Sequence, residues 1–254
     1  MFQLNQVQFA VPERVLLHNI NLTFHTQKVY GLIGHNGSGK STLLKLLVRQ
    51  HRATAGKILL DGKCVDDYSP REYAQHLAYL PQHLPAAAAL TAEELVKMGR
   101  YAWTGLTGRE TEADRAAVQR ALALTRTEKF RHEFVDNLSG GERSRVWLAM
   151  CLAQESRYLL LDEPLAALDI AHQLDVMTLV RELSRELDLG VIVVIHDINL
   201  AARFCDELVA LHQGQVLKVG QPENIMTADV LRDIYSVEMQ ILHHPITGNV
   251  MAVP

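Results

Sequence analysis

The fold of this chain is decided by the stretch at residues 29–42, Val29-Tyr30-Gly31-Leu32-Ile33-Gly34-His35-Asn36-Gly37-Ser38-Gly39-Lys40-Ser41-Thr42. It begins as a short apolar run of the kind that forms a buried parallel strand. Three glycines, at 34, 37 and 39, then break the run into a loop. The chain leaves the loop through an apolar segment, residues 43–48, that has the composition of a helix. The pattern therefore predicts a strand, a glycine-rich loop and a helix in succession.

The spacing from Gly34 to Ser41 is G-x-x-x-x-G-K-S, which is typical of a loop that wraps a chain of phosphates. Glycines let backbone N–H groups approach the phosphate oxygens, and the helix N-terminus adds a positive dipole end. Lys40 would reach the β- and γ-phosphates, and the Ser41 hydroxyl would ligate Mg²⁺. We expect ATP to be held by the whole loop: Gly34, His35, Asn36, Gly37, Ser38, Gly39, Lys40, Ser41 and Thr42.

Composition narrows the class of protein. The 254 residues are 48% hydrophobic and 21% charged, as in ordinary globular proteins, and the net charge of −4 gives no basic surface for nucleic acid. Cys64, Cys151 and Cys205 lie far apart, which suits a reducing compartment and offers no zinc site. The N-terminus resembles no signal peptide, and no apolar run approaches the ~18–20 residues that span a bilayer. We therefore expect any service to a membrane to pass through a partner chain.

Periodicity predicts an α/β protein with a helical insert. Strands are expected at 7–11, 20–24, 58–60, 77–80, 158–161, 191–195 and, as a pair around a turn, 208–219. Residues 86–156 are rich in Ala, Leu, Arg and Glu, with helices predicted after the capping pattern at Thr91, over 110–124 and from Ser139. A further helix over 170–189 should end at Gly190, and the tail from 221 should add a short helix and a strand.

A carboxylate pair follows the apolar run at residues 158–161. A buried parallel strand delivers its next residues to the crevice where α/β sheets bind ligands. Asp162 would hold Mg²⁺, and Glu163 would polarise a water molecule against the γ-phosphate. A strand that merely ends in an acidic turn is the plain alternative.

The segment Leu138-Ser139-Gly140-Gly141-Glu142 opens a helix with a capping-box pattern. Each glycine costs that helix roughly 1 kcal/mol against alanine, which indicates that something approaches the backbone closely. A hydroxyl, bare N–H groups and a dipole end could form a second phosphate clamp from Ser139, Gly140, Gly141 and Glu142. Because one γ-phosphate does not need two clamps, we expect a homodimer in which each clamp closes over the partner's nucleotide.

Three single polar residues complete the candidate set. Gln82 and His196 each follow an apolar strand, and each could be an ordinary loop residue. In a functional site, Gln82 would contact Mg²⁺ and water, and His196 would contact the γ-phosphate. Asp169 either caps the following helix or crosses the dimer interface.

These stretches, in this order, resemble the ATP-binding cassette (ABC) ATPases. Residues 34–42 match Walker A, Gln82 the Q-loop, 138–142 the signature, 159–163 Walker B, 167–169 the D-loop and His196 the switch histidine. The resemblance implies a P-loop NTPase with a RecA-like core, an N-terminal antiparallel β subdomain and an α-helical signature subdomain. It places the core at 1–85 and 157–222, the helical insert at 86–156 and the tail at 223–254 of one domain. It also implies ATP hydrolysis and a separate permease.

Four further segments, 99–101, 147–154, 168–173 and 196–203, look like the ferric-siderophore import ATPases, and the iron(III)-hydroxamate type above all. Such subunits sit on the cytoplasmic face of the inner membrane, beside a two-fold permease fed by a substrate-binding protein. A haem or vitamin B12 importer is the runner-up. A soluble ABC ATPase of DNA repair or translation is the rival from another class, and a nucleotide-binding module that does not hydrolyse is a second.

One departure from the family concerns the base. Many cassettes stack an aromatic side chain near position 11 on adenine, and this chain has Val11. Phe9 and Tyr30 are aromatic, and each is either a core residue or the missing stack.

Overall fold

The structure is a computed structural model that describes residues 1–254 except 88, 106–107, 167, 247 and 249. Two compact units make up the chain: residues 1–67 with 190–254, and residues 68–189. The second unit extends beyond the insert expected at 86–156, because it also contains the strands and the two helices that flank that segment.

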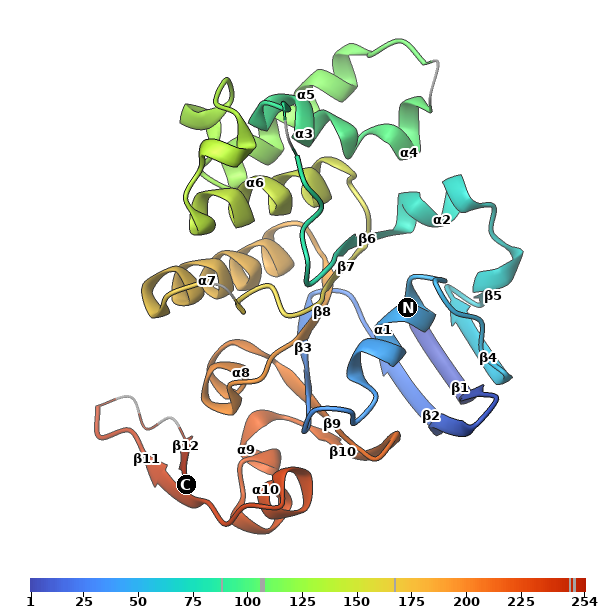
Figure 1. The fold of residues 1–254 in the computed structure, drawn as a ribbon, viewed down its shortest axis with the longest axis vertical. Helices are drawn as coiled ribbons and strands as arrows, with labels where there is room; N and C mark the ends of the chain where they lie inside the picture. Colours follow the sequence, from blue (N-terminus) through green and yellow to red (C-terminus); the bar gives the residue numbers. More distant parts are fainter. Residues whose placement is uncertain (88, 106–107, 167, 247, 249) are drawn as a thin grey trace. The chain divides into compact units, whose positions relative to one another are not determined.

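The first unit contains an antiparallel sheet with the strand order β2-β1-β4-β5 (Figure 1). Its strands are β1 Phe2–Val11, β2 Arg14–Phe24, β4 Ala55–Leu60 and β5 Lys63–Cys64. Both turn residues between β4 and β5, Asp61 and Gly62, have positive φ, at 51° and 83°. That geometry matches the twist of a two-residue hairpin. The predicted alternating strands and the N-terminal antiparallel sheet are confirmed.

A second sheet in the first unit positions the phosphate loop. β3 Lys28–Ile33 pairs in parallel with β8 Gly190–Val194 and with β9 Glu207–His212, and β10 Gln215–Gly220 runs antiparallel to β9. All five residues of β8 are buried, as the continuous apolar run predicts. Helix α1 Lys40–Leu47 follows β3, and α8 Ile198–Phe204 follows β8.

The tail is richer than the predicted helix and strand. It forms α9 Pro222–Ile225, α10 Ala228–Tyr235 and an antiparallel hairpin of β11 Gln240–His243 with β12 Val250–Val253. Gly248 has φ +70° and donates its N–H to the His244 carbonyl at 2.8 Å. The second strand was missed because its few apolar residues gain a face only when they pair with β11.

The second unit carries the helical insert and a parallel pair of strands (Figure 1). Its strands are β6 Leu77–Leu80 and β7 Tyr158–Leu161. Its helices are α2 Pro70–His76, α3 Ala92–Met98, α4 Tyr101–Thr104, α5 Glu112–Leu124, α6 Gly140–Ala153 and α7 Ile170–Glu186. Short 3₁₀ turns are η1 Val65–Asp67 in the first unit, and η2 Glu128–Phe130 and η3 Val135–Asn137 in the second.

Two predicted helix limits need correction. The helix expected from residue 110 begins at Glu112, because Thr111 is its N-cap and forms a capping box with Asp114. The helix expected to reach 189 ends at Glu186, and Gly190 is not its C-terminal cap. Asp188 takes the left-handed conformation instead, with φ +55°, which aspartate tolerates better than most residues.

Across the described part of the chain, no helix combines the length and the apolar character needed to cross a membrane.

Candidate nucleotide-binding site

The phosphate loop has the backbone that its glycines predict. Gly34, Gly37 and Gly39 have backbone φ angles of +144°, +80° and +107°, which residues with a Cβ rarely adopt. A Cβ on Gly34 would also lie 2.2 Å from the Leu211 carbonyl oxygen of β9. The loop therefore needs glycine at its first position both for conformation and for space.

Lys40 closes the loop from inside. Its ammonium donates to the carbonyl oxygens of Gly34 at 2.8 Å and His35 at 3.0 Å, and the residue is only 5% exposed. A flexible ammonium can exchange carbonyl oxygens for phosphate oxygens with little backbone movement. The lysine is thus held at the centre of the curve that the loop makes. Ser41 and Thr42 form the first turn of α1, behind Gly39.

The turn between β9 and β10 supports the loop, which sequence reasoning missed. The Gly214 N–H donates to the Ser38 carbonyl at 3.0 Å, and the rings of His35 and His212 meet edge to face with centroids 5.1 Å apart. Tyr235 of α10 also lies near the loop. Burial raises the pKa of its phenol to about 12, although the Gly34 backbone acts to lower that pKa. Only the glycine in this turn hinted at such a close approach.

The two aromatic alternatives for an adenine stack are both engaged. Tyr30 is 1% exposed, meets Phe24 edge to face at 5.0 Å, and its hydroxyl accepts the His25 N–H at 2.9 Å. Phe9 stacks on His51 with ring centroids 4.9 Å apart and planes 15° apart. Tyr30 is therefore a core residue, and Phe9 already has an aromatic partner.

His196 lies exposed between β8 and α8, as its position after an apolar strand predicts. The next residue, Asp197, caps α8: its carboxylate accepts the N–H groups of Asn199 at 2.8 Å and Leu200 at 3.0 Å. An aspartate directly before an apolar helical segment is the sequence signal for this cap.

In the second unit, the structure brings Gln82 and Glu163 together. The Gln82 amide Nε2 donates to Glu163 Oε2 at 2.6 Å. Glu163 has φ +50°, an uncommon conformation outside glycine. Such strain persists where surrounding structure requires it and is often found at functional sites.

Asp162 is 5% exposed and has a partner that sequence reasoning missed. The Tyr79 hydroxyl of β6 donates to Asp162 Oδ2 at 3.4 Å. Burial, and then the Asp162 carboxylate, raise the pKa of Tyr79 to about 12, so the phenol stays protonated and can keep donating.

The predicted capping box at the start of α6 is present. The Glu142 carboxylate accepts the Ser139 hydroxyl at 2.6 Å and the Ser139 N–H at 3.0 Å. The hydroxyl, followed by the N–H of Ser139, lowers the pKa of Glu142, so this carboxylate stays charged. Ser139 and Gly140 are exposed, and Gly141 is buried.

A histidine explains the buried glycine. A Cβ on Gly141 would lie 2.2 Å from the His172 ring, whose Nδ1 is 2.8 Å from Asp169 Oδ1. Asp169 also caps α7 by accepting the His172 N–H at 2.9 Å. The N-cap alternative for Asp169 is therefore present in the structure, and the close approach to Gly141 comes from this same chain. Ala167, predicted for the same loop, lies outside the described residues.

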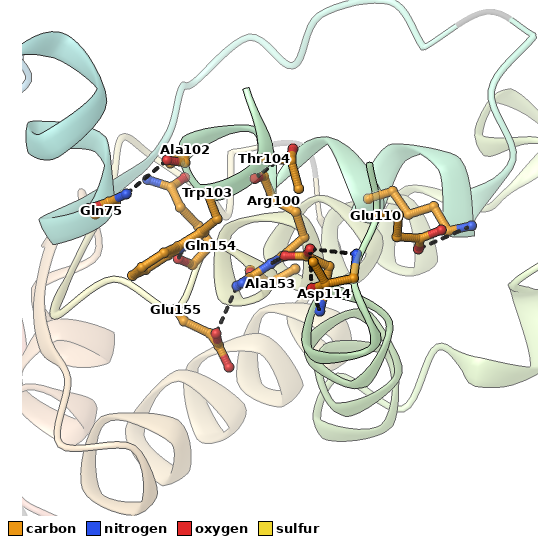
Figure 2. Close-up of polar contacts among 12 residues, drawn as sticks. Gln75, Arg100, Ala102, Trp103, Thr104, Glu110, Asp114, Ala153, Gln154 and Glu155 are labelled. Carbon is orange, nitrogen blue, oxygen red and sulfur yellow. Dashed lines mark hydrogen bonds and ion pairs between the residues drawn. The ribbon is translucent and has the colours of Figure 1, made fainter. Parts of the chain in front are cut away.

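Arg100 fastens the helical insert together (Figure 2). Its guanidinium, 8% exposed, donates to Asp114 Oδ1 at 2.9 Å, and to the Ala153 carbonyl and Glu155 Oε2 at 2.8 Å each. Trp103 adds a bond from its indole N–H to the Gln154 carbonyl at 2.7 Å. One buried cation thus joins the ends of α3 and α6 to the start of α5.

Residues 17–166 match the family model of the ABC transporter. The petrobactin import ATP-binding protein of Bacillus anthracis is 41% identical over 95% of this chain and 89% of its own length. The iron(3+)-hydroxamate import ATP-binding protein of Bacillus subtilis is 39% identical over 96% and 90%, and the ferric enterobactin transport ATP-binding protein of Escherichia coli is 40% identical over 98% and 92%.

Solved structures agree on the fold. The ADP conformation of an ATP-binding cassette has a TM-score of 0.83 at 19% identity, covering 92% of this chain and 96% of that one. The dimeric structure of a bacterial ABC transporter cassette has a TM-score of 0.74 at 28% identity, covering 87% and 99%. The fold is therefore that of an ABC ATPase. The chain belongs to the ABC transporter family and couples ATP hydrolysis to transport.

Proposed function

We propose that this chain energises the import of a ferric siderophore through a separate inner-membrane permease, from the cytoplasmic face. The observation that carries the proposal is the match, over nearly the whole chain, to import ATPases whose names give petrobactin, iron(3+)-hydroxamate and enterobactin as cargo. The sequence identities of these three relatives to this chain, 39% to 41%, are too similar to favour one cargo over another. The hydroxamate type therefore rests on the sequence segments quoted above.

The nucleotide is ATP, held by residues 34–42. The donor set suits Mg²⁺, a hard cation that prefers oxygen ligands. Ser41 offers a hydroxyl and Asp162 a carboxylate. Gln82 offers its amide oxygen, because its amide nitrogen is turned toward Glu163. When bound, Mg²⁺ neutralises charge on the β- and γ-phosphates.

Glu163 acts as the general base. The bond from Gln82 orients its carboxylate, which takes a proton from the water that attacks the γ-phosphorus. The bond from the γ-phosphorus to the bridging oxygen breaks, and ADP leaves with that oxygen while phosphate is formed. His196 contacts the γ-phosphate. Ser139, Gly140, Gly141 and Glu142 clamp the nucleotide of a second copy in a homodimer, and Asp169 contributes to the same interface. A substrate-binding protein delivers the siderophore to the permease.

The base is tested with Glu163→Gln. We expect ATP binding to persist, hydrolysis to fall ~10²-fold or more, and an ATP-bound dimer to accumulate. Hydrolysis by the transporter complex is measured as phosphate release, and dimerisation by size exclusion with ATP. Near-normal turnover would exclude Glu163 as the base. It would also argue against the alternative of a nucleotide-binding module that does not hydrolyse ATP.

The cargo is tested by uptake. Cells that carry this chain with its permease receive radioactive iron as hydroxamate, catecholate and petrobactin-type complexes, and haem and cobalamin in parallel. We expect uptake of one siderophore class that disappears with Lys40→Ala. Uptake of haem or cobalamin alone would establish the runner-up.

A further inference from the structure

The C-terminal strand β12 is tied to the helix that follows His196. The Asn199 side chain of α8 makes two bonds to the backbone of Ala252. Its Nδ2 donates to the Ala252 carbonyl at 3.0 Å, and its Oδ1 accepts the Ala252 N–H at 2.8 Å. An asparagine amide thus pairs with β12 as a neighbouring strand would. We call this pair the tail clamp.

The clamp uses backbone groups that the hairpin leaves over. In the hairpin, Ala252 stands opposite Ile241, and Val253 stands opposite Gln240. An N–H donates one hydrogen bond, so the Ala252 N–H belongs to Asn199 and not to β11. Antiparallel pairs alternate between bonded and non-bonded, which makes Gln240 and Val253 a bonded pair. Ala252 is also 4% exposed, while Val253 beside it is 41% exposed.

Asn199 is held from its backbone as well. Its N–H donates to Asp197 Oδ1, the cap of α8, and His196 directly precedes that cap. Helix α8 has only seven residues, too few to be stable without outside contacts. The clamp thus fixes the first turn of α8 from the tail while Asp197 fixes it from the loop.

We propose that Asn199 is a positioning residue for ATP hydrolysis, which holds the start of α8, and with it His196, by binding Ala252 of the tail. The inference rests on the proposed role of His196. It gives the C-terminal hairpin a task in catalysis, since the last strand of the chain completes the support of the switch histidine. Among the residues that the structure describes, the hydrogen bonds of Asn199 and Ala252 do not reach the phosphate loop, so we expect nucleotide affinity not to depend on the tail clamp.

The clamp can be broken from either side. Asn199→Ala removes both bonds, and Ala252→Pro removes the N–H donor from the tail while leaving the ladder to β11 intact. Val253→Pro is the matched control, because it removes an N–H of the same strand that faces β11 instead of Asn199. Full-length variants are measured for ATP hydrolysis with their permease.

We expect Asn199→Ala and Ala252→Pro to lower kcat about tenfold with KM for ATP unchanged, a modest loss for a displaced catalytic group. Val253→Pro should stay within about twofold of the parent. Hydrogen exchange should quicken at the Asn199 and Leu200 amides in both clamp variants. Unchanged kcat in both, whatever their stability, would overturn the proposal and reduce the clamp to an anchor for the tail.

A double-mutant cycle separates this inference from the function on which it rests. Single-turnover hydrolysis of labelled ATP is measured for His196→Ala with and without Asn199→Ala. We expect no further loss from Asn199→Ala once His196 is gone. Losses that multiply would show that Asn199 does not act through His196. Wild-type hydrolysis by His196→Ala itself would instead contradict the proposed role of His196.

Discussion

Val11 leaves the adenine side of the site without an aromatic residue at the family's usual position. Tyr30 does not replace the missing aromatic residue, because its ring is buried against Phe24. The Phe9 ring stacks on His51. An aliphatic contact forgoes base stacking, which is worth ~1–3 kcal/mol per base in comparable sites.

We therefore predict weak discrimination between bases, with GTP bound and hydrolysed within about tenfold of ATP, since one lost contact of ~1.4 kcal/mol is a factor of ten. Val11→Tyr should tighten ATP binding. Competition between ATP and GTP for the isolated chain measures both. A strong preference for ATP, with no gain from Val11→Tyr, would show that another residue completes the pocket.

Gly141 offers a test in which the sign of the effect is informative. Gly→Ala inside a helix ordinarily stabilises by about 0.5–1 kcal/mol. Here the new Cβ would lie 2.2 Å from the His172 ring, so we predict a destabilisation of about 1–3 kcal/mol by overpacking, together with reduced hydrolysis.

Urea denaturation of Gly141→Ala gives the first number, and the double variant with His172→Ala gives the control. Removing the ring should recover most of the lost stability. A single variant more stable than the parent would mean that the ring moves aside freely.

At the scale of elements, the buried Arg100 guanidinium joins three parts of the second unit. Arg100→Ala would leave Asp114, whose side chain is 6% exposed, without its guanidinium (Figure 2). Breaking a buried pair from one side costs about 3–5 kcal/mol, and we predict a loss of that size. Arg100→Lys should recover part of it, since an ammonium cannot reach Asp114, Ala153 and Glu155 together.

Arg120→Ala is the matched control, because Arg120 also pairs with Glu155, at 3.2 Å, but is 59% exposed. Its loss should change the free energy of unfolding by about 0.5 kcal/mol or less. Equal losses at positions 100 and 120 would show that burial of Arg100 does not govern the stability of the insert.

At the scale of the whole molecule, the proposed dimer predicts a separation of binding from hydrolysis. Ser139→Arg should abolish hydrolysis and leave ATP binding to the monomer nearly unchanged, because the proposed phosphate clamp at residues 139–142 would serve another chain's nucleotide. Equilibrium binding and phosphate release are compared with Lys40→Ala, which should lose binding.

Ser139→Ala is the control for the capping box, since losing the Ser139 hydroxyl alone costs about 0.5–2 kcal/mol of helix stability. It should hydrolyse ATP far better than Ser139→Arg. If monomeric Ser139→Arg loses ATP binding as severely as Lys40→Ala, then residues 139–142 and the phosphate loop act on one nucleotide, and the argument for the dimer fails.

Local patterns predicted most of the elements. The strands before Gly34, Asp162 and His196 are continuous apolar runs, and the caps at Thr91 and Ser139 are short-range hydrogen bonds written in neighbouring residues. The predicted ends of helices were wrong where the contact that ends the helix joins residues farther apart than a capping box does. Ser184 accepts the Leu189 N–H through its carbonyl at 3.0 Å, which helps to end α7 before Gly190.

The amino-acid sequence by itself determined the fold family, the phosphate loop and the acidic pair after β7, because these depend on glycine conformation, hydrophobic runs and residue spacing. Only the tertiary structure decided which distant residues contact the predicted motifs. His172 against Gly141, Gly214 on Ser38, and Ala252 on Asn199 join positions between 31 and 176 residues apart in the chain. Such contacts leave no periodic trace, since each depends on where folding brings a single side chain or backbone group.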